Sequence, residues 1–404
     1  MSRSRSLRVA IIKPDWEFRG GGEVAVDHVE RLLVNDGHDV RRHAVPVASV
    51  GRRPFGLDVP DERWRAAPEY FRHLALLDAI ERLDVGPADL VLSTQPPSYA
   101  VNHPKHLSIF FHHLRVFYDL SDLYLAAGFV ADADVHLAAQ RRLRALEQDR
   151  FDRVGWFCPI SETVQERLGR FNAVGQSSVL HLGAGLGDDR DGRASVAPGT
   201  GPVLCVSRSE FPKRTELFVH AMKYLPSTSG CLVGMGGRLP WVRATDVRLS
   251  SPDVDLDAVR PEELWLNRGE WASPGADDAP HTNVIFAGRV ADDALLRRYR
   301  EAPCVVAPAY DEDYGLTALE AMALGRPVVV ASDGGGLTTL VEDGVNGFVV
   351  QPSGRAIAEA VERILGDADL AFRLGEGALA TAAEHSWARC AAELRTAVER
   401  VLSG

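Results

Sequence analysis

The fold is decided by the stretch EDYGLTALEAMALGRPVVVASDGGG, which occupies residues 312–336. Its run VVVA at 328–331 is typical of a strand buried on both faces, as in a parallel sheet. Residues 317–324 before it have the spacing of a helix, and glycines stand at Gly315 and at 334–336. A helix, a buried strand and a glycine-rich turn in this order indicate an α/β domain on a parallel sheet.

The same alternation of apolar runs and helical segments continues on both sides of this stretch. Strands are predicted, in chain order, at 7–12, 39–44, 89–93, 107–111, 178–182, 203–206, 231–233, 284–287, 304–307 and 348–350. The chain is therefore predicted to form Rossmann-like domains over 1–185 and 203–385, with a Gly- and Asp-rich linker at 186–202. A C-terminal helix within 386–404 is expected to pack back on the first domain. Two stretches rich in Pro and charged residues are expected to be irregular, in whole or in part: 52–67 and 241–280.

The bulk composition limits the class of protein. The chain has 404 residues, of which 46% are hydrophobic and 25% charged, as is typical of a globular protein with more than one domain. Its formal net charge of −11 argues against a nucleic-acid partner, because phosphate backbones recruit basic faces. Five cysteines without a CxxC pair favour free thiols in a reducing compartment, and the first apolar run is too short for a signal sequence or a membrane span. We expect a cytoplasmic, bacterial protein with at most peripheral membrane contact.

Open parallel sheets bind their ligands beyond the carboxyl ends of the strands, so the loops there are the candidate site. Three glycines at 20–22 precede the first helix, where backbone N–H groups can approach an anion. His112, His113 and Arg115 follow the strand predicted at 107–111, and only one of the two histidines can point the same way as the inner face of that strand. A loop without a ligand and ordinary surface histidines are the alternative interpretations.

The second half places charged residues in the corresponding loops. Arg208 and Lys213 follow the first strand of this half and could clamp a diphosphate, although their spacing alone favours a solvated basic loop. Glu312 and Glu320 stand on either side of Gly315, which allows the backbone to pass close to a ligand at the start of a helix. Glu320 lies about a turn into that helix and is placed to reach ribose hydroxyls. Carboxylates near a helix N-terminus are also ordinary complements of its dipole.

From Glu312 onward the sequence resembles the pattern E-x-F-G-L-x-x-L-E-A-M-A-x-G-x-P-V of the retaining GT-B glycosyltransferases of family four, the group 1 glycosyltransferases. The resemblance continues downstream in VEDGVNGFVV and upstream in LVGMGG and VSRSEFPKR, and it covers most of 203–350. It is looser in the first half, where GGGEVAVDHVERLLVNDGHDV is similar to the first loop and helix of the family. FFHHLRVFYDL resembles a segment that carries an acceptor-domain histidine in one subgroup. One departure is the pair Thr338 and Thr339, which stands where the family often has a glutamate.

The resemblance implies a GT-B architecture, with two Rossmann-like domains facing across a cleft. It also implies retaining, metal-independent transfer of a sugar from a nucleoside-diphosphate sugar to a hydroxyl acceptor, without a cofactor. The Arg-, Ala- and Asp-rich composition indicates a high-GC bacterium, for which the expected acceptors are a glycan, a lipid-linked sugar or a secondary metabolite. The alternatives are a non-catalytic nucleotide-sugar-binding protein and a Rossmann-type enzyme that modifies sugar nucleotides or uses NAD. The absence of an early G-x-G-x-x-G turn disfavours the last of these.

The resemblance also implies roles for individual residues. Arg208 and Lys213 would hold the donor diphosphate and stabilise it as it leaves. Glu312 would contact hydroxyls of the donor sugar, and Glu320 would bind the ribose. His112 is the preferred catalytic histidine of the acceptor domain. The remaining implied contacts are Tyr314, Gly315, Leu316, Gly21, Gly22 and Gly234 to the donor, and His113 and Arg115 on the acceptor side.

A metal site is not predicted. Asp132-Ala133-Asp134 has the letters of an Asp-x-Asp metal clamp, but it stands at the start of a predicted helix and far along the chain from the donor motifs. Aspartate is a favoured helix N-cap, because its side chain accepts a hydrogen bond from an unpaired backbone N–H group. A capped helix is therefore the favoured interpretation of these residues.

Overall fold

The computed structural model describes residues 6–17, 20–186, 199–266 and 282–404. The chain divides into two compact units. Unit 1 consists of Met1–Leu182 together with Trp387–Gly404, and unit 2 of Gly183–Ser386. Much of the predicted linker, 187–198, lies outside the described residues, as does 267–281.

Unit 1 is built on a five-stranded parallel sheet with the strand order β2-β1-β3-β4-β5. The strands are β1 (Arg8–Asp15), β2 (Asp39–Pro46), β3 (Leu90–Ser93), β4 (His106–Phe110) and β5 (Trp156–Pro159). The helices are α1 (Gly21–Asn35), α2 (Asp61–Ala66), α3 (Pro68–Glu81), α4 (Ser121–Ala126), α5 (Ala133–Phe151), α6 (Glu162–Asn172) and α15 (Trp387–Ser403). Short 3-10 turns are η1 (Val47–Ser49), η2 (Pro54–Gly56), η3 (Ser98–Ala100) and η4 (Arg115–Phe117).

Unit 2 repeats this plan with a six-stranded parallel sheet in the order β11-β10-β9-β6-β7-β8. The strands are β6 (Val203–Val206), β7 (Gly230–Val233), β8 (Val284–Gly288), β9 (Val305–Ala307), β10 (Val328–Ala331) and β11 (Gly347–Val350). The helices are α7 (Thr215–Lys223), α8 (Leu239–Leu249), α9 (Pro261–Trp265), α10 (Asp292–Glu301), α11 (Leu316–Ala323), α12 (Gly336–Leu340), α13 (Gly354–Gly366) and α14 (Ala368–Glu384), with the turn η5 (Phe211–Lys213).

Two helices of unit 1 show why these segments are helical, and the strands of both units show how helices bury the sheets. In α1 the residues Ala25, Val26, Val29 and Leu33 are buried, which is the spacing of one helical face against a sheet. Ser161 begins α6 as an N-cap, and its side chain accepts a hydrogen bond from a backbone N–H group one turn on. In both sheets the central strands are buried along their length, because helices cover both faces.

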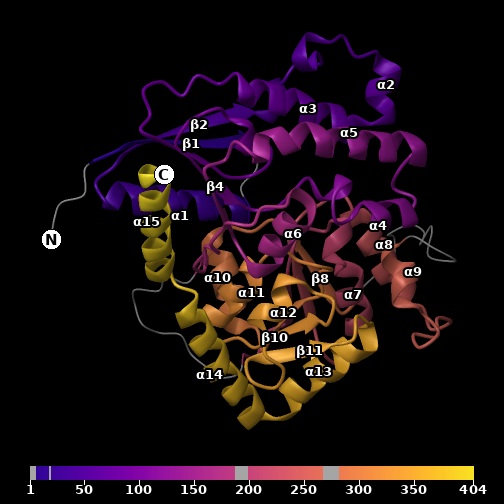
Figure 1. Cartoon of the computed structure of the whole chain (residues 1–404). Coiled ribbons are helices and arrows are strands. Elements are labelled where there is room, and N and C mark those ends of the chain that lie inside the picture. The colour runs from indigo at the N-terminus through magenta and orange to yellow at the C-terminus, as the bar shows by residue number, and fades with distance from the viewer. Residues whose placement is uncertain (1–5, 18–19, 187–198, 267–281) are drawn as a thin grey trace. The chain divides into compact units, whose positions relative to one another are not determined.

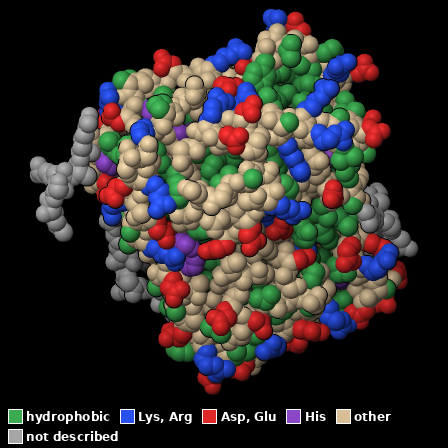
Figure 2. All heavy atoms as spheres, in the orientation of Figure 1, with side chains coloured by type: hydrophobic (Ala, Val, Ile, Leu, Met, Phe, Trp, Pro, Cys, Tyr) green, Lys and Arg blue, Asp and Glu red, His purple; other side chains and the backbone are tan. Residues whose placement is uncertain are grey.

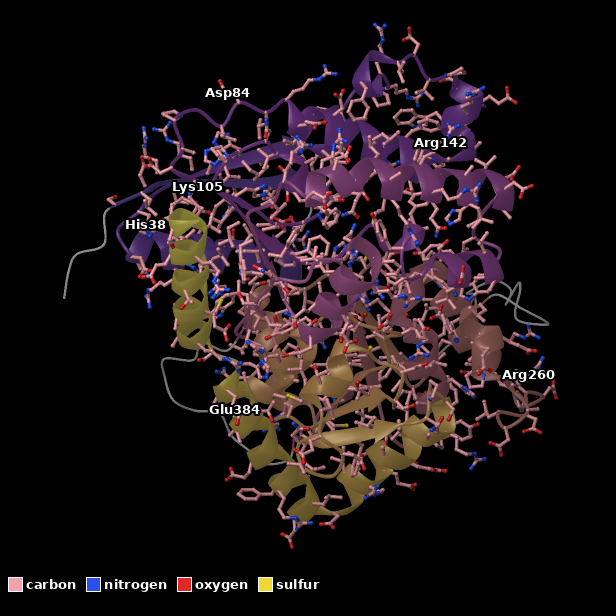
Figure 3. The ribbon with its side chains drawn as sticks, in the orientation of Figure 1. His38, Asp84, Lys105, Arg142, Arg260 and Glu384 are labelled. Carbon is pink, nitrogen blue, oxygen red and sulfur yellow. The ribbon has the colours of Figure 1, made fainter. Side chains whose placement is uncertain are left out.

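The C-terminal helix α15 belongs to unit 1, where it packs against α1, β4 and β5 (Figure 1). Trp387 at its start stacks on His28 of α1, with ring centroids 4.2 Å apart. Near its end, the carbonyl of Leu402 accepts a hydrogen bond of 3.2 Å from Lys105, which is labelled in Figure 3. The last helix of the chain thus completes the unit that the first helix begins.

Two predicted segments, 178–182 and 52–67, differ from the structure, whereas 241–280 was expected to be irregular only in part. Residues 178–182 form no strand: Ser178 and Leu180 donate backbone hydrogen bonds to β5, but the ladder does not continue. Within 52–67, which was expected to be irregular, the chain forms η2 and α2. The stretch 241–280 includes most of α8 and all of α9, and its last part lies outside the described residues. Proline sits in the first turn of α8 and of α9, where the helix tolerates it because the first N–H groups are unpaired anyway.

The surface is mixed in charge. Figure 2 shows Lys and Arg side chains interspersed with Asp and Glu side chains over the visible face. Among the described residues, no helix combines the length and the apolar character that are needed to cross a membrane.

Candidate functional site

The loops at the carboxyl edge of the unit 2 sheet are packed tightly together. Gly234, directly after β7, has φ +137°, and a Cβ there would lie 2.0 Å from the carbonyl oxygen of Ser207 after β6. The N–H of Gly234 donates a 2.9 Å hydrogen bond to the carbonyl of Gly288 at the end of β8. Glycine is required at this position because no side chain fits between the two loops. This edge is where a ligand of an open parallel sheet is expected.

Lys213 and Glu312 meet at this edge although they lie 99 residues apart in the chain. Lys213 ends the turn η5 after β6, and Glu312 lies in the loop between β9 and α11. Lys213 Nζ lies 2.5 Å from Glu312 Oε2, and the two side chains are 24% and 16% exposed. The N–H of Glu312 donates to the carbonyl of Gly334 at 2.9 Å, so the loop after β10 fixes its backbone. A cation and a carboxylate are thus held side by side at a partly open position.

The N-terminus of α11 adjoins this pair. Gly315 is the N-cap residue with φ +105°, and a Cβ there would lie 2.7 Å from the side chain of Leu337. Tyr314 is buried, and its hydroxyl lies 3.2 Å from His385 Nδ1. Leu316 begins the helix, and the unpaired N–H groups of a helix's first turn favour an anion. The predicted donor contacts Tyr314, Gly315 and Leu316 therefore form one continuous helix start.

Glu320 lies one turn further along α11 and is 8% exposed. Tyr299 of α10 donates a 3.0 Å hydrogen bond to its Oε2. Burial of the side chain raises the pKa of Glu320 to about 7, and the hydrogen bond from Tyr299 opposes this rise only in part. The carboxyl group of Glu320 therefore changes charge near neutral pH.

Glu320→Gln is expected to make the stability of the protein less dependent on pH. The native pKa of about 7 lies above the unfolded value of 4.5, so the contribution of Glu320 to stability is full below pH 4.5 and is lost as the pH rises through 7. The loss amounts to ~3 kcal/mol for a fully buried group. Urea unfolding at pH 5 and pH 8 measures it: the wild type should lose more stability than the variant between the two. Equal losses of unfolding free energy in the wild type and the variant would contradict a raised pKa at Glu320.

Arg208 lies in the loop after β6 and is exposed, whereas Lys213 is half-buried in the same loop. The sequence did not single out the next residue, Arg214, which is 1% exposed and hydrogen-bonds the loops after β9 and β10. The only sequence signal for it is a basic pair before a helix start. That signal does not tell which of the two side chains turns outward and which turns inward.

The carboxyl edge of the unit 1 sheet carries the other predicted residues. Gly21 is exposed in the first turn of α1, and a Cβ on Gly22 would lie 2.8 Å from the amide nitrogen of Gln95. That amide donates a 3.2 Å hydrogen bond to Glu23, which also pairs with the buried Lys13 of β1. Glycine at position 22 thus lets α1 start against the loop that follows β3.

His112 and His113 have opposite environments. His112 is half-buried at the end of β4, and its Nδ1 lies 2.6 Å from the carbonyl oxygen of His113. A neutral ring that donates this hydrogen bond through Nδ1 presents Nε2 as an acceptor. His113 is 1% exposed, stacks on Tyr118 and bonds Asn172 through Nε2 at 2.7 Å. Burial lowers the pKa of His113 to about 4.

The ring of His113 is enclosed by aromatic side chains, which disfavours the predicted contact with the acceptor. These neighbours are Phe110, Tyr118, Phe151 and Phe171. Arg115 lies in η4 and forms hydrogen bonds of 2.8 and 2.7 Å with Asp119, and its acceptor-side role stays a prediction. Asp132 is the N-cap of α5 and accepts from the N–H of Val135, as the interpretation of 132–134 as a helix start requires.

Comparison with known proteins finds similarity to glycosyltransferases over part of the chain. The family model described as "Glycosyl transferases group 1" matches residues 279–380. Over 222 residues the chain is 39% identical to a D-inositol 3-phosphate glycosyltransferase of Stackebrandtia nassauensis, a match that covers 51% of this chain and 48% of that protein. The chain spans about half the length, or less, of the curated relatives it matches.

Solved structures share the fold over nearly the whole chain. Sucrose-phosphate synthase from Thermosynechococcus elongatus is similar with a TM-score of 0.63 at 19% identity, covering 97% of this chain and 98% of that one. Anabaena Alr3699/HepE in complex with UDP and glucose is similar with a TM-score of 0.57 at 16% identity, covering 96% and 98% of the two chains. Identities this low show the fold alone. The fold they share with this chain is the GT-B fold, and residues 279–380 are similar to the group 1 glycosyltransferases.

Proposed function

We propose that this protein is a retaining, metal-independent glycosyltransferase that moves a sugar from a nucleoside-diphosphate sugar to a hydroxyl acceptor. The observation that carries the proposal is the Lys213–Glu312 pair at the carboxyl edge of the unit 2 sheet. In such a donor an anionic diphosphate is joined directly to a polyhydroxylated ring. A cation beside a hydrogen-bond-accepting carboxylate matches those two neighbouring parts, with Lys213 toward the diphosphate and Glu312 toward the sugar hydroxyls.

The chemistry asks the protein to stabilise charge on the leaving group. As the bond between the anomeric carbon and the phosphate oxygen breaks, negative charge grows on the diphosphate. Lys213, Arg208 and the N-terminus of α11 would stabilise that charge without a metal ion. Glu320, one turn into the same helix, would accept a hydrogen bond from the ribose. Retention of anomeric configuration is proposed to follow from attack on the same face of the sugar that the leaving diphosphate vacates.

The acceptor side is assigned to unit 1. Its sheet presents His112 and the glycine-started helix α1 at the carboxyl edge, as the family resemblance implies for the acceptor-binding domain. The Nδ1 of His112 is engaged with the carbonyl of His113, so Nε2 is the ring nitrogen that we propose to bond a hydroxyl group of the acceptor. The acceptor is proposed to be a carbohydrate or another small hydroxylated molecule, and the enzyme is proposed to act in the cytoplasm.

Alanine substitutions of the two adjacent histidines should have different effects. His112→Ala is expected to lower transfer about tenfold, the worth of one hydrogen bond, with little change in stability. His113→Ala is expected to lower the free energy of unfolding by about 2–4 kcal/mol, because it opens a cavity among buried aromatic rings. Initial rates and urea unfolding of both variants measure this. If His113→Ala instead lowered transfer without lowering stability, and His112→Ala left transfer unchanged, the functional histidine would be His113.

The proposal is tested first by ligand binding. Thermal-shift and calorimetric titrations with UDP, GDP, TDP, ADP and NAD, all in the presence of EDTA, should show stabilisation by one nucleoside diphosphate and should name the donor base. Stabilisation by NAD alone would favour an oxidoreductase. Binding of a nucleoside-diphosphate sugar without turnover in the presence of a broad acceptor panel would favour a non-catalytic binding protein. NMR analysis of the anomeric configuration of the product then tests retention.

A further inference from the structure

We propose that Arg214 is a positioning residue that holds Glu312 in place for the donor sugar without touching the donor itself. The inference rests on the proposed function. It adds a buried residue that holds the loops around the Lys213–Glu312 pair. Arg214 directly follows Lys213 in the chain, but the two side chains go to different places. Lys213 is partly open at the site, whereas Arg214 is 1% exposed.

The guanidinium of Arg214 joins two loops. Its Nε donates to the carbonyl of Pro308 at 2.8 Å and its Nη2 to the carbonyl of Ala309 at 3.2 Å, both in the loop after β9. Its Nη1 and Nη2 also bind the two carboxylate oxygens of Asp333, at 2.9 and 2.5 Å, in the loop after β10. This planar fork of donors is a property of arginine that lysine cannot reproduce.

The loops that Arg214 joins are the ones that fix the backbone of Glu312. The N–H of Asp311 donates to the carbonyl of Asp333 at 2.8 Å, and the N–H of Glu312 donates to the carbonyl of Gly334 at 2.9 Å. The carbonyl of Glu312 in turn accepts from Gly336 at 2.7 Å. Asp333 is therefore part of the same short ladder as Glu312, and its carboxylate is held by Arg214.

Aromatic rings enclose the buried cation. The guanidinium carbon of Arg214 lies 5.2 Å from the ring centroid of Trp265 and 5.4 Å from that of Tyr310. Trp265 is the last residue of α9. Arg260, the N-cap residue of that helix, is labelled in Figure 3. The N–H of Tyr310 donates to the carbonyl of Pro212 at 2.7 Å, so the turn that carries Lys213 is tied to the same assembly. These contacts leave the guanidinium little freedom to move.

The backbone at Arg214 also indicates a requirement for this side chain. Its φ of +47° is left-handed, a conformation that favours glycine. Glycine at this position would relieve the backbone but would remove every contact to the two loops. We infer that the bracing of Glu312 is the reason why an arginine occupies this position.

A double-mutant cycle between Arg214→Lys and Glu312→Gln tests the inference. The assay is hydrolysis or transfer of the nucleoside-diphosphate sugar whose base the binding panel selects, together with the calorimetric affinity for the free nucleoside diphosphate. Arg214→Lys is expected to lower turnover about 30-fold in the wild-type background and less than threefold in the Glu312→Gln background. The affinity for the free diphosphate should change less than threefold, because that ligand lacks the sugar that Glu312 contacts.

Arg326→Lys is the matched control. Arg326 is a second buried arginine of unit 2, 2% exposed, and its guanidinium also donates to backbone carbonyls, those of Leu324 and Ala302. Arg326→Lys should lower the free energy of unfolding, but its effect on turnover should be the same with and without Glu312→Gln. Equal losses from Arg214→Lys in both backgrounds, or the same kinetic pattern in Arg326→Lys, would overturn the positioning role while leaving the proposed function in place. A wild-type protein that neither binds nor turns over any donor would instead overturn the proposed function, and this inference with it.

Discussion

Glu312→Ala is expected to lower the rate of sugar transfer by about 10²–10³-fold while the protein stays folded. The carboxylate is placed to accept hydrogen bonds from donor-sugar hydroxyls, and each bond to a charged group contributes about 1.5–3 kcal/mol. The side chain is 16% exposed and its backbone is held by the loop after β10, so truncation should not open a large cavity. The measurement is the initial rate of transfer at saturating donor, compared with the melting temperature of the same preparation.

Glu342→Ala is the control for this variant, because Glu342 is an exposed carboxylate of unit 2 outside the site. It should transfer sugar at close to the wild-type rate. Affinity for the free nucleoside diphosphate should be much less affected by Glu312→Ala than turnover is. If Glu312→Ala retained more than a third of the wild-type rate, the assignment of Glu312 to the donor sugar would be wrong.

The sequence predicted the two parallel sheets and most of their strands because buried parallel strands have a strong signature. Runs such as VVVA at 328–331 and VLCV at 203–206 became β10 and β6 with little change of bounds. The stretch 178–182 (SVLHL) is also rich in apolar residues, yet it only donates two backbone hydrogen bonds to β5 and forms no strand. Its apolar residues Leu180 and Leu182 are buried there without forming a strand, so the composition of this run reports burial rather than pairing.

The sequence predicted that Lys213 and Glu312 lie in loops at the carboxyl edge of one sheet. Parallel strands bring their carboxyl ends to one edge, so Lys213 after β6 and the loop after β9 had to be neighbours once the strand order was known. The sequence could place both residues in loops, but it could not show that their side chains pair. The resemblance to a family suggested their roles, and the structure supplies the 2.5 Å contact between them.

Two other residues show where sequence reasoning reaches its limit. His113 and its neighbour His112 are indistinguishable by residue type, and the difference between them comes from rings contributed by α5 and α6, far along the chain. Arg214 resembles any basic residue before a helix, and its burial depends on contacts with the loops after β9 and β10. Both cases depend on contacts between distant segments, which no local pattern records.

Lys213→Ala is expected to lower turnover by about 10²–10³-fold, the cost of removing one preorganised charge from a developing anion. Its Nζ lies beside Glu312 and the side chain is 24% exposed, so the expected loss is mainly electrostatic rather than a loss of packing. Lys213→Arg keeps the charge and should recover part of the rate.

A small alkylammonium ion such as ethylammonium should partly rescue the alanine variant but should not speed up the wild type, because it restores a cation in the vacated space. Both readouts are initial rates of transfer. A Lys213→Ala protein that turned over at close to the wild-type rate, with no response to ethylammonium, would remove Lys213 from the leaving-group site.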